Sequence, residues 1–155
     1  MGCPFERIIA GLQPAMERLL AMEPVRIEAI PQGFPVSGVY LLSEGSRHLY
    51  VGRSRNIKQR LGRHSRPGAT HRMAALAFRM AREETGHVRR AYAARGSRKD
   101  LMQDPRFAAA FMAAKARIRA MDVRAVAEAD PATQAILEIY VAVELGTPYN
   151  DWDTH

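Results

Sequence analysis

The sequence predicts an α+β fold in which a small, three-stranded, mostly antiparallel sheet is flanked by helices. Two short apolar runs, GVYLL at 38–42 and HLYVG at 48–52, are separated by the polar segment SEGSR and predict a β-hairpin. A third run, VRAVAEA at 123–129, has the composition of a strand. Helical periodicity on both sides of these runs supplies the remaining elements.

The segment before the hairpin predicts an N-terminal extension over residues 1–35. Residues 5–22 have apolar residues at helical spacing, and Pro14 predicts a kink or break inside that helix. Residues 25–30, VRIEAI, predict a short strand followed by a connector rich in proline and glycine. No feature of this extension indicates a function.

A helix is expected directly after the hairpin. Asn56 can cap it, with Gln59 three residues later as in a capping box, and RPG at 66–68 ends it. Residues 70–85 predict an amphipathic helix that stops at Gly86.

The last two predicted helices both begin with Asp-Pro, a combination typical of helix starts. One runs from Asp104 to about residue 120, and the other follows Asp130 and ends at Gly146. The mostly helical stretch at about 66–121 is thus predicted as an insertion between the hairpin helix and the third strand.

Length and composition favour one globular domain over residues 1–155. Hydrophobic residues make up 47% of the chain, and no apolar run approaches the ~20 residues that span a bilayer. The N-terminus lacks the pattern of a secretory signal, and a lone Cys3 excludes an internal disulfide and a cysteine-based zinc site. We therefore expect a cytoplasmic protein with no membrane partner.

The positive charge is concentrated in one part of the chain. The formal net charge is +7, yet residues 47–106 hold 16 Lys and Arg against 4 Asp and Glu. Such a distribution is typical of a surface that binds a polyanion such as nucleic acid. A solvated basic surface without a partner, or arginine usage set by genome composition, explains the same count.

The hairpin and the helix after it place several polar side chains close together. Tyr40 and Tyr50 can face the same side of the sheet, although strand tyrosines are most often structural. Arg60 and His64 are four residues apart and share one helix face. Arg53 comes just before the helix, where unfilled backbone N–H groups favour an anion, so a phosphate site is plausible here.

A carboxylate interrupts the apolar run AILEIYVAV near the C-terminus. Glu138 can occupy a solvent-facing polar stripe together with Gln134, four residues earlier. Alternatively it is a partly buried ligand for Mg²⁺, which needs only one or two carboxylates when phosphates are near. Asn150 follows Pro148, and a turn is its default role.

Taken together, these motifs resemble the GIY-YIG nuclease superfamily. The early motif consists of Gly38-Val39-Tyr40 and Tyr50-Val51-Gly52, and is followed by Arg60 and His64. The late motif, Glu138 with Asn150 twelve residues on, matches the superfamily's metal-binding glutamate and its asparagine. Two separated motifs in the expected order are more specific than either one alone.

The resemblance implies an endonuclease that hydrolyses DNA phosphodiester bonds with Mg²⁺ or Mn²⁺. By analogy, Tyr40 would help to deprotonate or position the attacking water, with His64 as a further candidate, so the general base stays open. Tyr50 would hold the phosphate or assist the proton transfer, and Arg60 would stabilise charge on the phosphoryl oxygens. Glu138 would bind the metal, and Asn150 would brace the site. The rival hypothesis is a DNA-binding or scaffolding protein that keeps the fold without cleaving.

The insertion has two interpretations that the sequence leaves open. It either contacts DNA with its basic face or covers the sheet. No second DNA-binding module is recognisable, so the chain is expected to act alone or with a partner protein that targets it. The residues predicted to contact DNA are Arg53, Lys58, Arg63, Arg79, Arg82, Arg89 and Arg90.

Overall fold

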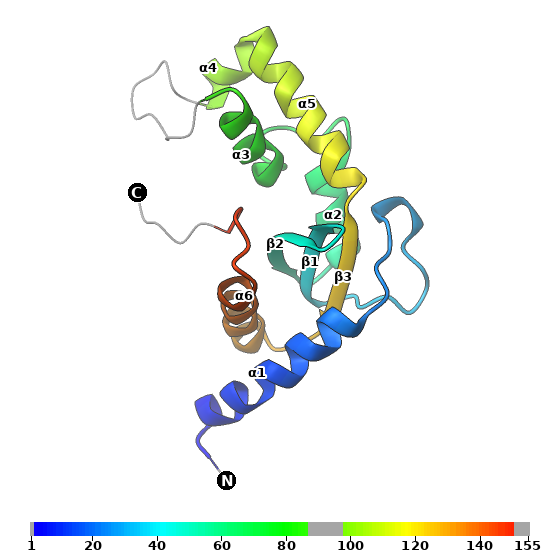
Figure 1. The fold of residues 1–155 in the computed structure, drawn as a ribbon, viewed down its shortest axis with the longest axis vertical. Coiled ribbons are helices and arrows are strands. Elements are labelled where there is room, and N and C mark those ends of the chain that lie inside the picture. The colour runs from blue at the N-terminus through cyan, green and yellow to red at the C-terminus, as the bar shows by residue number, and fades with distance from the viewer. Residues whose placement is uncertain (1, 87–97, 151–155) are drawn as a thin grey trace. The chain divides into compact units, whose positions relative to one another are not determined.

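The computed structural model describes residues 2–86 and 98–150, which form two compact units. The first unit joins Met1–Arg60 with Met121–His155, and the second is Leu61–Ala120. Figure 1 labels the helices and strands of both units. The stretch predicted as an insertion, about 66–121, lies almost entirely in the second unit.

The first unit is built on a three-stranded antiparallel sheet. Its strands are β1 (Gly38–Glu44), β2 (Arg47–Ser54) and β3 (Asp122–Ala127), in the order β2-β1-β3. Both β2 and β3 pair antiparallel with β1, which is the central strand. The predicted α+β class and three-stranded sheet are therefore confirmed.

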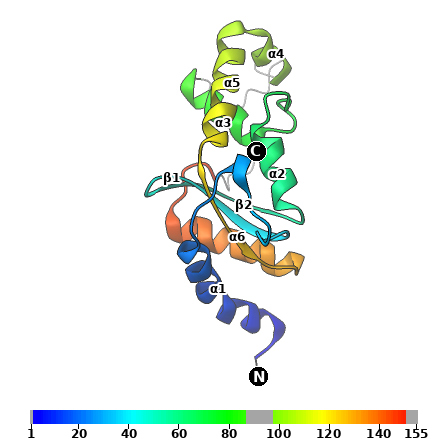
Figure 2. The ribbon, with the colours of Figure 1, turned by 90° about the vertical axis from the view of Figure 1, so that its right-hand side faces the viewer.

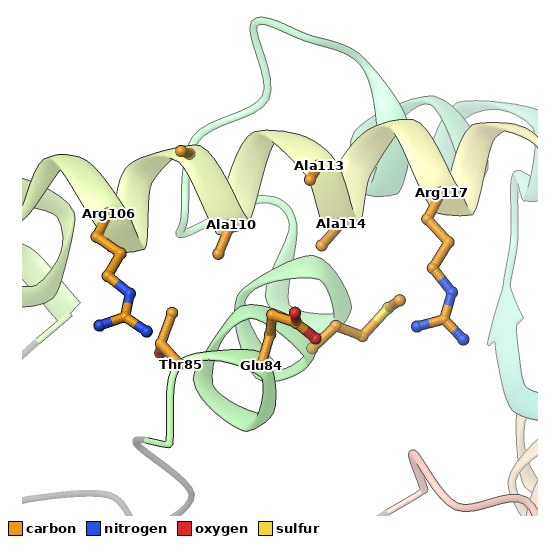
Figure 3. Close-up of a pocket in the computed structure, with 9 residues that line it drawn as sticks. Glu84, Thr85, Arg106, Ala110, Ala113, Ala114 and Arg117 are labelled. Atoms are coloured by element: carbon orange, nitrogen blue, oxygen red, sulfur yellow. The ribbon is translucent and has the colours of Figure 1, made fainter.

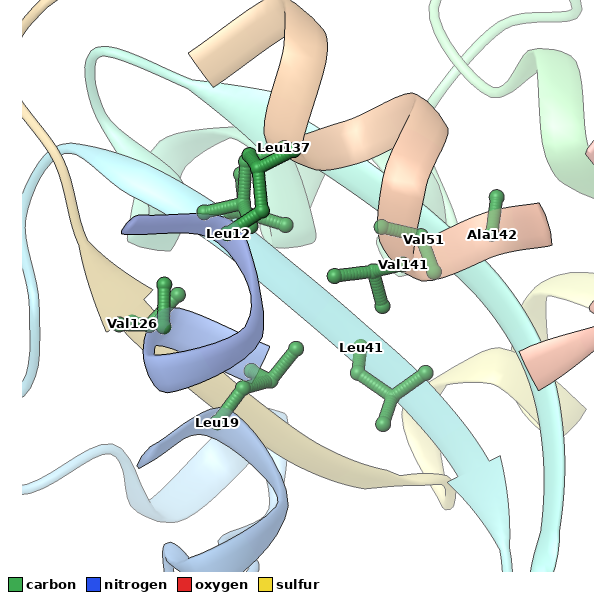
Figure 4. Close-up of a cluster of buried hydrophobic side chains, with 10 residues drawn as sticks. Leu12, Leu19, Leu41, Val51, Val126, Leu137, Val141 and Ala142 are labelled. Atoms are coloured by element: carbon green, nitrogen blue, oxygen red, sulfur yellow. The ribbon is translucent and has the colours of Figure 1, made fainter. Parts of the chain in front are cut away.

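Two helices, α1 (Pro4–Ala21) and α6 (Pro131–Leu145), pack against this sheet and against each other. Both lie beside the sheet in the two views of Figure 1 and Figure 2. Because side chains alternate along a strand, Leu41 faces the helices while Tyr40 points to the opposite face. The apolar cluster formed by the sheet and helices is drawn in Figure 4 and includes Leu12, Leu19, Leu41, Val51, Val126, Leu137 and Val141.

Two predictions for the N-terminal extension are corrected. Pro14 lies inside helix α1, which runs on to Ala21, so the predicted break does not occur. Leu12, Ala15 and Leu19 are buried on both sides of it and hold the helix to the core. The predicted strand at 25–30 is wrong. Val25 forms an isolated bridge with Val123, and Ile27–Ala29 form the 3₁₀ turn η1.

Local capping chemistry sets several helix ends as expected. In front of α2 (Ile57–Ser65), the Gln59 amide donates to Asn56 Oδ1 at 3.1 Å. The Asn56 amide itself donates to Ser54 Oγ at 2.9 Å. Asp130 Oδ2 accepts from the Thr133 amide at 2.9 Å at the start of α6, and Gly146, with φ +63°, ends that helix.

The second unit contains α3 (Ala75–Glu84), α4 (Arg98–Gln103) and α5 (Pro105–Arg119). Helix α3 starts five residues later than predicted because residues 70–74 form turns, and α4 was not predicted. Helices α3 and α5 pack around three phenylalanines, with ring centroids 5.0 Å apart for Phe78–Phe107 and 6.2 Å for Phe78–Phe111.

A groove of about 400 Å³ lies between α3 and α5. Ala110, Ala113 and Ala114 line it, and the side chains of Arg106 and Arg117 extend on the same side of α5 (Figure 3).

Within residues 2–86 and 98–150, no helix is long and apolar enough to cross a membrane.

Candidate active site

The two tyrosines of the hairpin lie diagonally across β1 and β2. The register pairs Tyr40 with Gly52 and Leu42 with Tyr50, so both rings are on one face of the sheet. Their centroids are 6.3 Å apart and the rings are tilted by 50°. Tyr40 is fully buried, whereas Tyr50 is half-buried and reaches the surface.

The two glycines of the motif are explained by close approaches. A Cβ on Gly52 would lie 2.9 Å from Tyr40 Cε1 and closer still to its Cζ and hydroxyl oxygen. The Tyr40 ring therefore lies directly over the backbone of β2. A Cβ on Gly38 would overlap the carbonyl oxygen of Val126, because β1 and β3 approach closely there.

Arg60, on α2, contacts the buried tyrosine. Its guanidinium donates a hydrogen bond to the Tyr40 hydroxyl. Burial, and secondarily the nearby Tyr50, raise the pKa of Tyr40 well above its usual value, and the opposing effect of Arg60 does not compensate. The Tyr40 side chain is therefore a neutral phenol at physiological pH.

Glu138, from α6, brings a carboxylate to the same place. Its side chain is 21% exposed, and its Oε1 lies 3.7 Å from Arg53 Nε. Burial raises the pKa of Glu138, and the charges of Arg53 and Arg60 act against that rise. The Glu138 charge in turn acts on Tyr40, so the carboxylate, the phenol and the guanidinium of Arg60 form one electrostatic cluster.

The predicted polar stripe shared by Gln134 and Glu138 is not solvent-facing at Gln134. Gln134 is buried, and its Nε2 donates to Ser37 Oγ at 2.9 Å and to the carbonyl oxygen of Glu128. This amide ties the start of α6 to the loop before it, so its role is structural. Glu138 is thus left as the partly exposed carboxylate of α6 that pairs with Arg53.

Asn150 binds the outer edge of β2. Its Oδ1 accepts from the Val51 amide at 2.8 Å, and its Nδ2 donates to the Val51 carbonyl oxygen at 2.7 Å. Two further residues that support this contact were not predicted from the sequence. Thr147 Oγ1 donates to Asn150 Oδ1 at 2.6 Å, and the Tyr149 amide donates to the Leu49 carbonyl oxygen at 3.2 Å. These bonds hold β2 on both sides of Tyr50, so Asn150 is more than a turn residue.

The expected anion site at the start of α2 is not open. The amides of Asn56, Ile57 and Gln59 donate to Ser54 Oγ, the Val36 carbonyl oxygen and Asn56 Oδ1, respectively. Three of the backbone N–H groups expected to be unfilled there therefore already have acceptors within the chain. Arg53, predicted as a phosphate contact, pairs with Glu138 in this structure.

The remaining predicted residues are distributed over α2 and the second unit. His64 follows Arg60 by one turn of α2 and is fully buried within the second unit. Lys58 and Arg63 are exposed on α2, while Arg79 and Arg82 on α3 are half-buried. Arg89 and Arg90 lie outside the described residues.

The side chains around Glu138 offer a divalent cation few ligands. Among the residues that the structure describes, no three His, Cys, Asp or Glu side chains gather into a group. Glu138 offers one partly covered carboxylate, beside which a guanidinium already stands as the compensating cation. Mg²⁺ and Mn²⁺ accept such a set when water and a substrate phosphate complete the coordination. The residues fit that kind of site.

Comparisons of the chain with protein-family models, curated proteins and solved structures found no match in any of the three. The resemblance to the GIY-YIG superfamily therefore stays a prediction that depends on the motifs and on the arrangement described above.

Proposed function

We propose that this chain is a divalent-metal-dependent endonuclease of the GIY-YIG type, which hydrolyses DNA phosphodiester bonds. One observation supports this most strongly: the Tyr40 ring lies 6.3 Å from that of Tyr50, and the charges of Arg60 on α2 and Glu138 on α6 both act on Tyr40. Phosphoryl transfer needs a positioned nucleophile and charge neutralisation on the phosphate oxygens. The two phenols can position the nucleophile, and the guanidinium, together with a metal held by the carboxylate, can neutralise the charge on the phosphate.

The two tyrosines have different tasks in this proposal. Because burial keeps Tyr40 protonated, its hydroxyl accepts a bond from Arg60 and has its own proton to donate. We therefore assign Tyr40 a positioning and donating role, which is one of the two alternatives, deprotonating or positioning the water, that the resemblance left open. Tyr50 reaches the surface and is the phenol that contacts the incoming phosphate or the attacking water.

Arg60 and Glu138 supply the charges. The guanidinium of Arg60, fixed by Tyr40, stabilises negative charge on the phosphoryl oxygens. Glu138 would hold Mg²⁺ or Mn²⁺, which when bound supplies further positive charge to the phosphate. Asn150 keeps the β2 backbone in place at Val51 and so positions Tyr50.

A plasmid assay tests the proposal. The purified chain should nick supercoiled DNA in Mg²⁺ or Mn²⁺ and should not do so in EDTA. Glu138→Gln should lower the nicking rate at least about 100-fold, the scale of losing one charge-stabilising group in an active site. Glu144→Gln, an exposed glutamate on the same helix, is the matched control and should cut like the wild type.

The outcome also separates the enzyme from the rival hypothesis. A wild-type chain that binds DNA in a salt-sensitive way but leaves the plasmid intact with either metal would be a DNA-binding or scaffolding protein. Nicking that survives Glu138→Gln undiminished would show that the assignment of the site is wrong.

A further inference from the structure

The ion pair between Arg53 and Glu138 gives the candidate site a second property, which depends on the proposed function. We propose that Arg53 is an internal counter-ion: its guanidinium holds Glu138 when no metal is bound, and moves to a substrate phosphate once Mg²⁺ or Mn²⁺ takes its place. Arg53 is then a positioning residue for the metal and a contact for the DNA backbone, in successive states of one site.

The geometry of the pair favours exchange over a permanent bond. The closest approach is 3.7 Å, between Arg53 Nε and Glu138 Oε1, which is longer than a hydrogen-bonded ion pair. The Arg53 side chain is 42% exposed, whereas that of Glu138 is 21% exposed. The arginine is therefore the partner that can leave toward solvent at little cost, while the carboxylate is held by α6.

Electrostatic repulsion explains why a divalent ion and the Arg53 guanidinium would not both stay beside Glu138. A divalent ion bound to Glu138 would stand within a few ångströms of the Arg53 guanidinium, in a partly covered site where like charges repel strongly. Arg60 already places one positive charge in the cluster, and its hydrogen bond to buried Tyr40 fixes it there. Arg53 is the more exposed of the two and is the one displaced.

The displaced guanidinium has a ready partner. Arg53 lies near the end of β2, one residue after Gly52, and its 42% exposed side chain can turn to a phosphate held at that end of the strand. A planar guanidinium binds phosphate oxygens through two parallel hydrogen bonds.

The first experiment measures Mn²⁺ affinity without DNA, for example by the electron paramagnetic resonance of free Mn²⁺ at about pH 8, where free carboxyl groups are ionised. Removing the competing cation in Arg53→Gln should tighten Mn²⁺ binding about two- to fivefold, the range expected for a partly exposed ion pair. Arg55→Gln, an exposed arginine two residues away, should leave the affinity unchanged. Unchanged or weaker binding in Arg53→Gln would overturn the proposal.

The second experiment needs no metal. Glu138→Gln should release Arg53 in EDTA, so that DNA binding gains about one phosphate contact and its salt slope steepens by about 0.9 relative to wild type. Adding Arg53→Gln to that variant should return the slope to the wild-type value. If the single and double variants have the same slope, Arg53 does not move to the phosphate and the proposal fails.

The two proposals fail in different ways. If Glu138→Gln neither weakens Mn²⁺ binding nor slows nicking, the proposed function itself is wrong. If both depend on Glu138 while Arg53→Gln changes neither the metal affinity nor the salt slope, the nuclease assignment stands and only the counter-ion role is refuted.

Discussion

Gly52→Ala is the substitution that tests the geometry of the site most directly. The added methyl group would lie 2.9 Å from Tyr40 Cε1 and closer to two further atoms of that ring. Tyr40 is fully buried and bonded to Arg60, so its ring has no direction in which to withdraw without losing contacts. Either the ring or the β2 backbone must shift.

The size of the effect follows from the cost of overpacking. Forcing extra atoms into a packed interior typically costs about 1–3 kcal/mol, and the displaced Arg60 hydrogen bond places Gly52→Ala at the upper end, about 2–3 kcal/mol. For a chain of this length the melting temperature should fall by roughly 4–12 °C. Thermal unfolding followed by circular dichroism measures this.

Gly11→Ala is the matched control because the chemical change is identical. Gly11 lies in α1, is exposed, and would have no atom within 4 Å of a new Cβ. Alanine should stabilise that helix by up to about 1 kcal/mol, which is the opposite sign. In the background of Tyr40→Ala, Gly52→Ala should cost little, because the ring it strikes has gone. A Gly52→Ala protein as stable as the wild type would refute the proposed position of the Tyr40 ring.

Three further predictions concern the supports of the site and the second unit. Thr147→Val keeps the shape of the side chain but removes the hydroxyl that donates to Asn150. It should lower the free energy of unfolding by about 1 kcal/mol and should also lower the nicking rate. Thr133→Val, which removes a hydroxyl away from β2, is the control and should leave the nicking rate unchanged. Lys115→Met leaves the carbonyl oxygens of Pro67 and Ala69 without their buried donor. The free energy of unfolding, measured in urea, should fall by about 2–3 kcal/mol. Lys99→Met, at an exposed position, is the control and should hardly change it. Burial, then Arg124, lowers the pKa of His48 below 6.5, so its contribution to stability is complete above about pH 6.5 and falls as the pH drops toward the folded-state pKa; His48→Gln should flatten that part of the profile.

Elements with local signals were predicted well. Asp104 and Asp130 cap α5 and α6, and Gly146 ends α6, each through bonds within a few residues of the signal. The prediction of a strand at 25–30 was wrong because strand pairing depends on a distant partner. Val25 and Val123 exchange two backbone hydrogen bonds in a single bridge, and the residues after Val25 continue into a 3₁₀ turn. Residue pattern alone does not contain that information.

The residues of the candidate site could be named from the sequence, but their burial and their contacts could not. The sequence could not tell that β1 is the central strand, and it is the central position that buries Tyr40 and makes it a poor base. It also could not show that Arg53 faces Glu138, or that Asn150 binds Val51, since each contact joins segments 85 or 99 residues apart. Charge partners and edge contacts of this kind are set by tertiary packing.

The structure also changes which residues of the motif argue for chemistry. Gly38 and Gly52 are explained by close approaches, and Val39 and Val51 belong to the apolar cluster, so these four positions need no function. A tyrosine packed over a glycine is itself a common structural device. The charged residues are different, because placing Arg60 and Glu138 near enough to act on a buried phenol incurs desolvation that apolar side chains would avoid. The proposed function explains that arrangement, because a site that binds a cation and a phosphate uses charges of both signs. The charges around the tyrosines, more than the tyrosines themselves, are therefore the reason to expect catalysis.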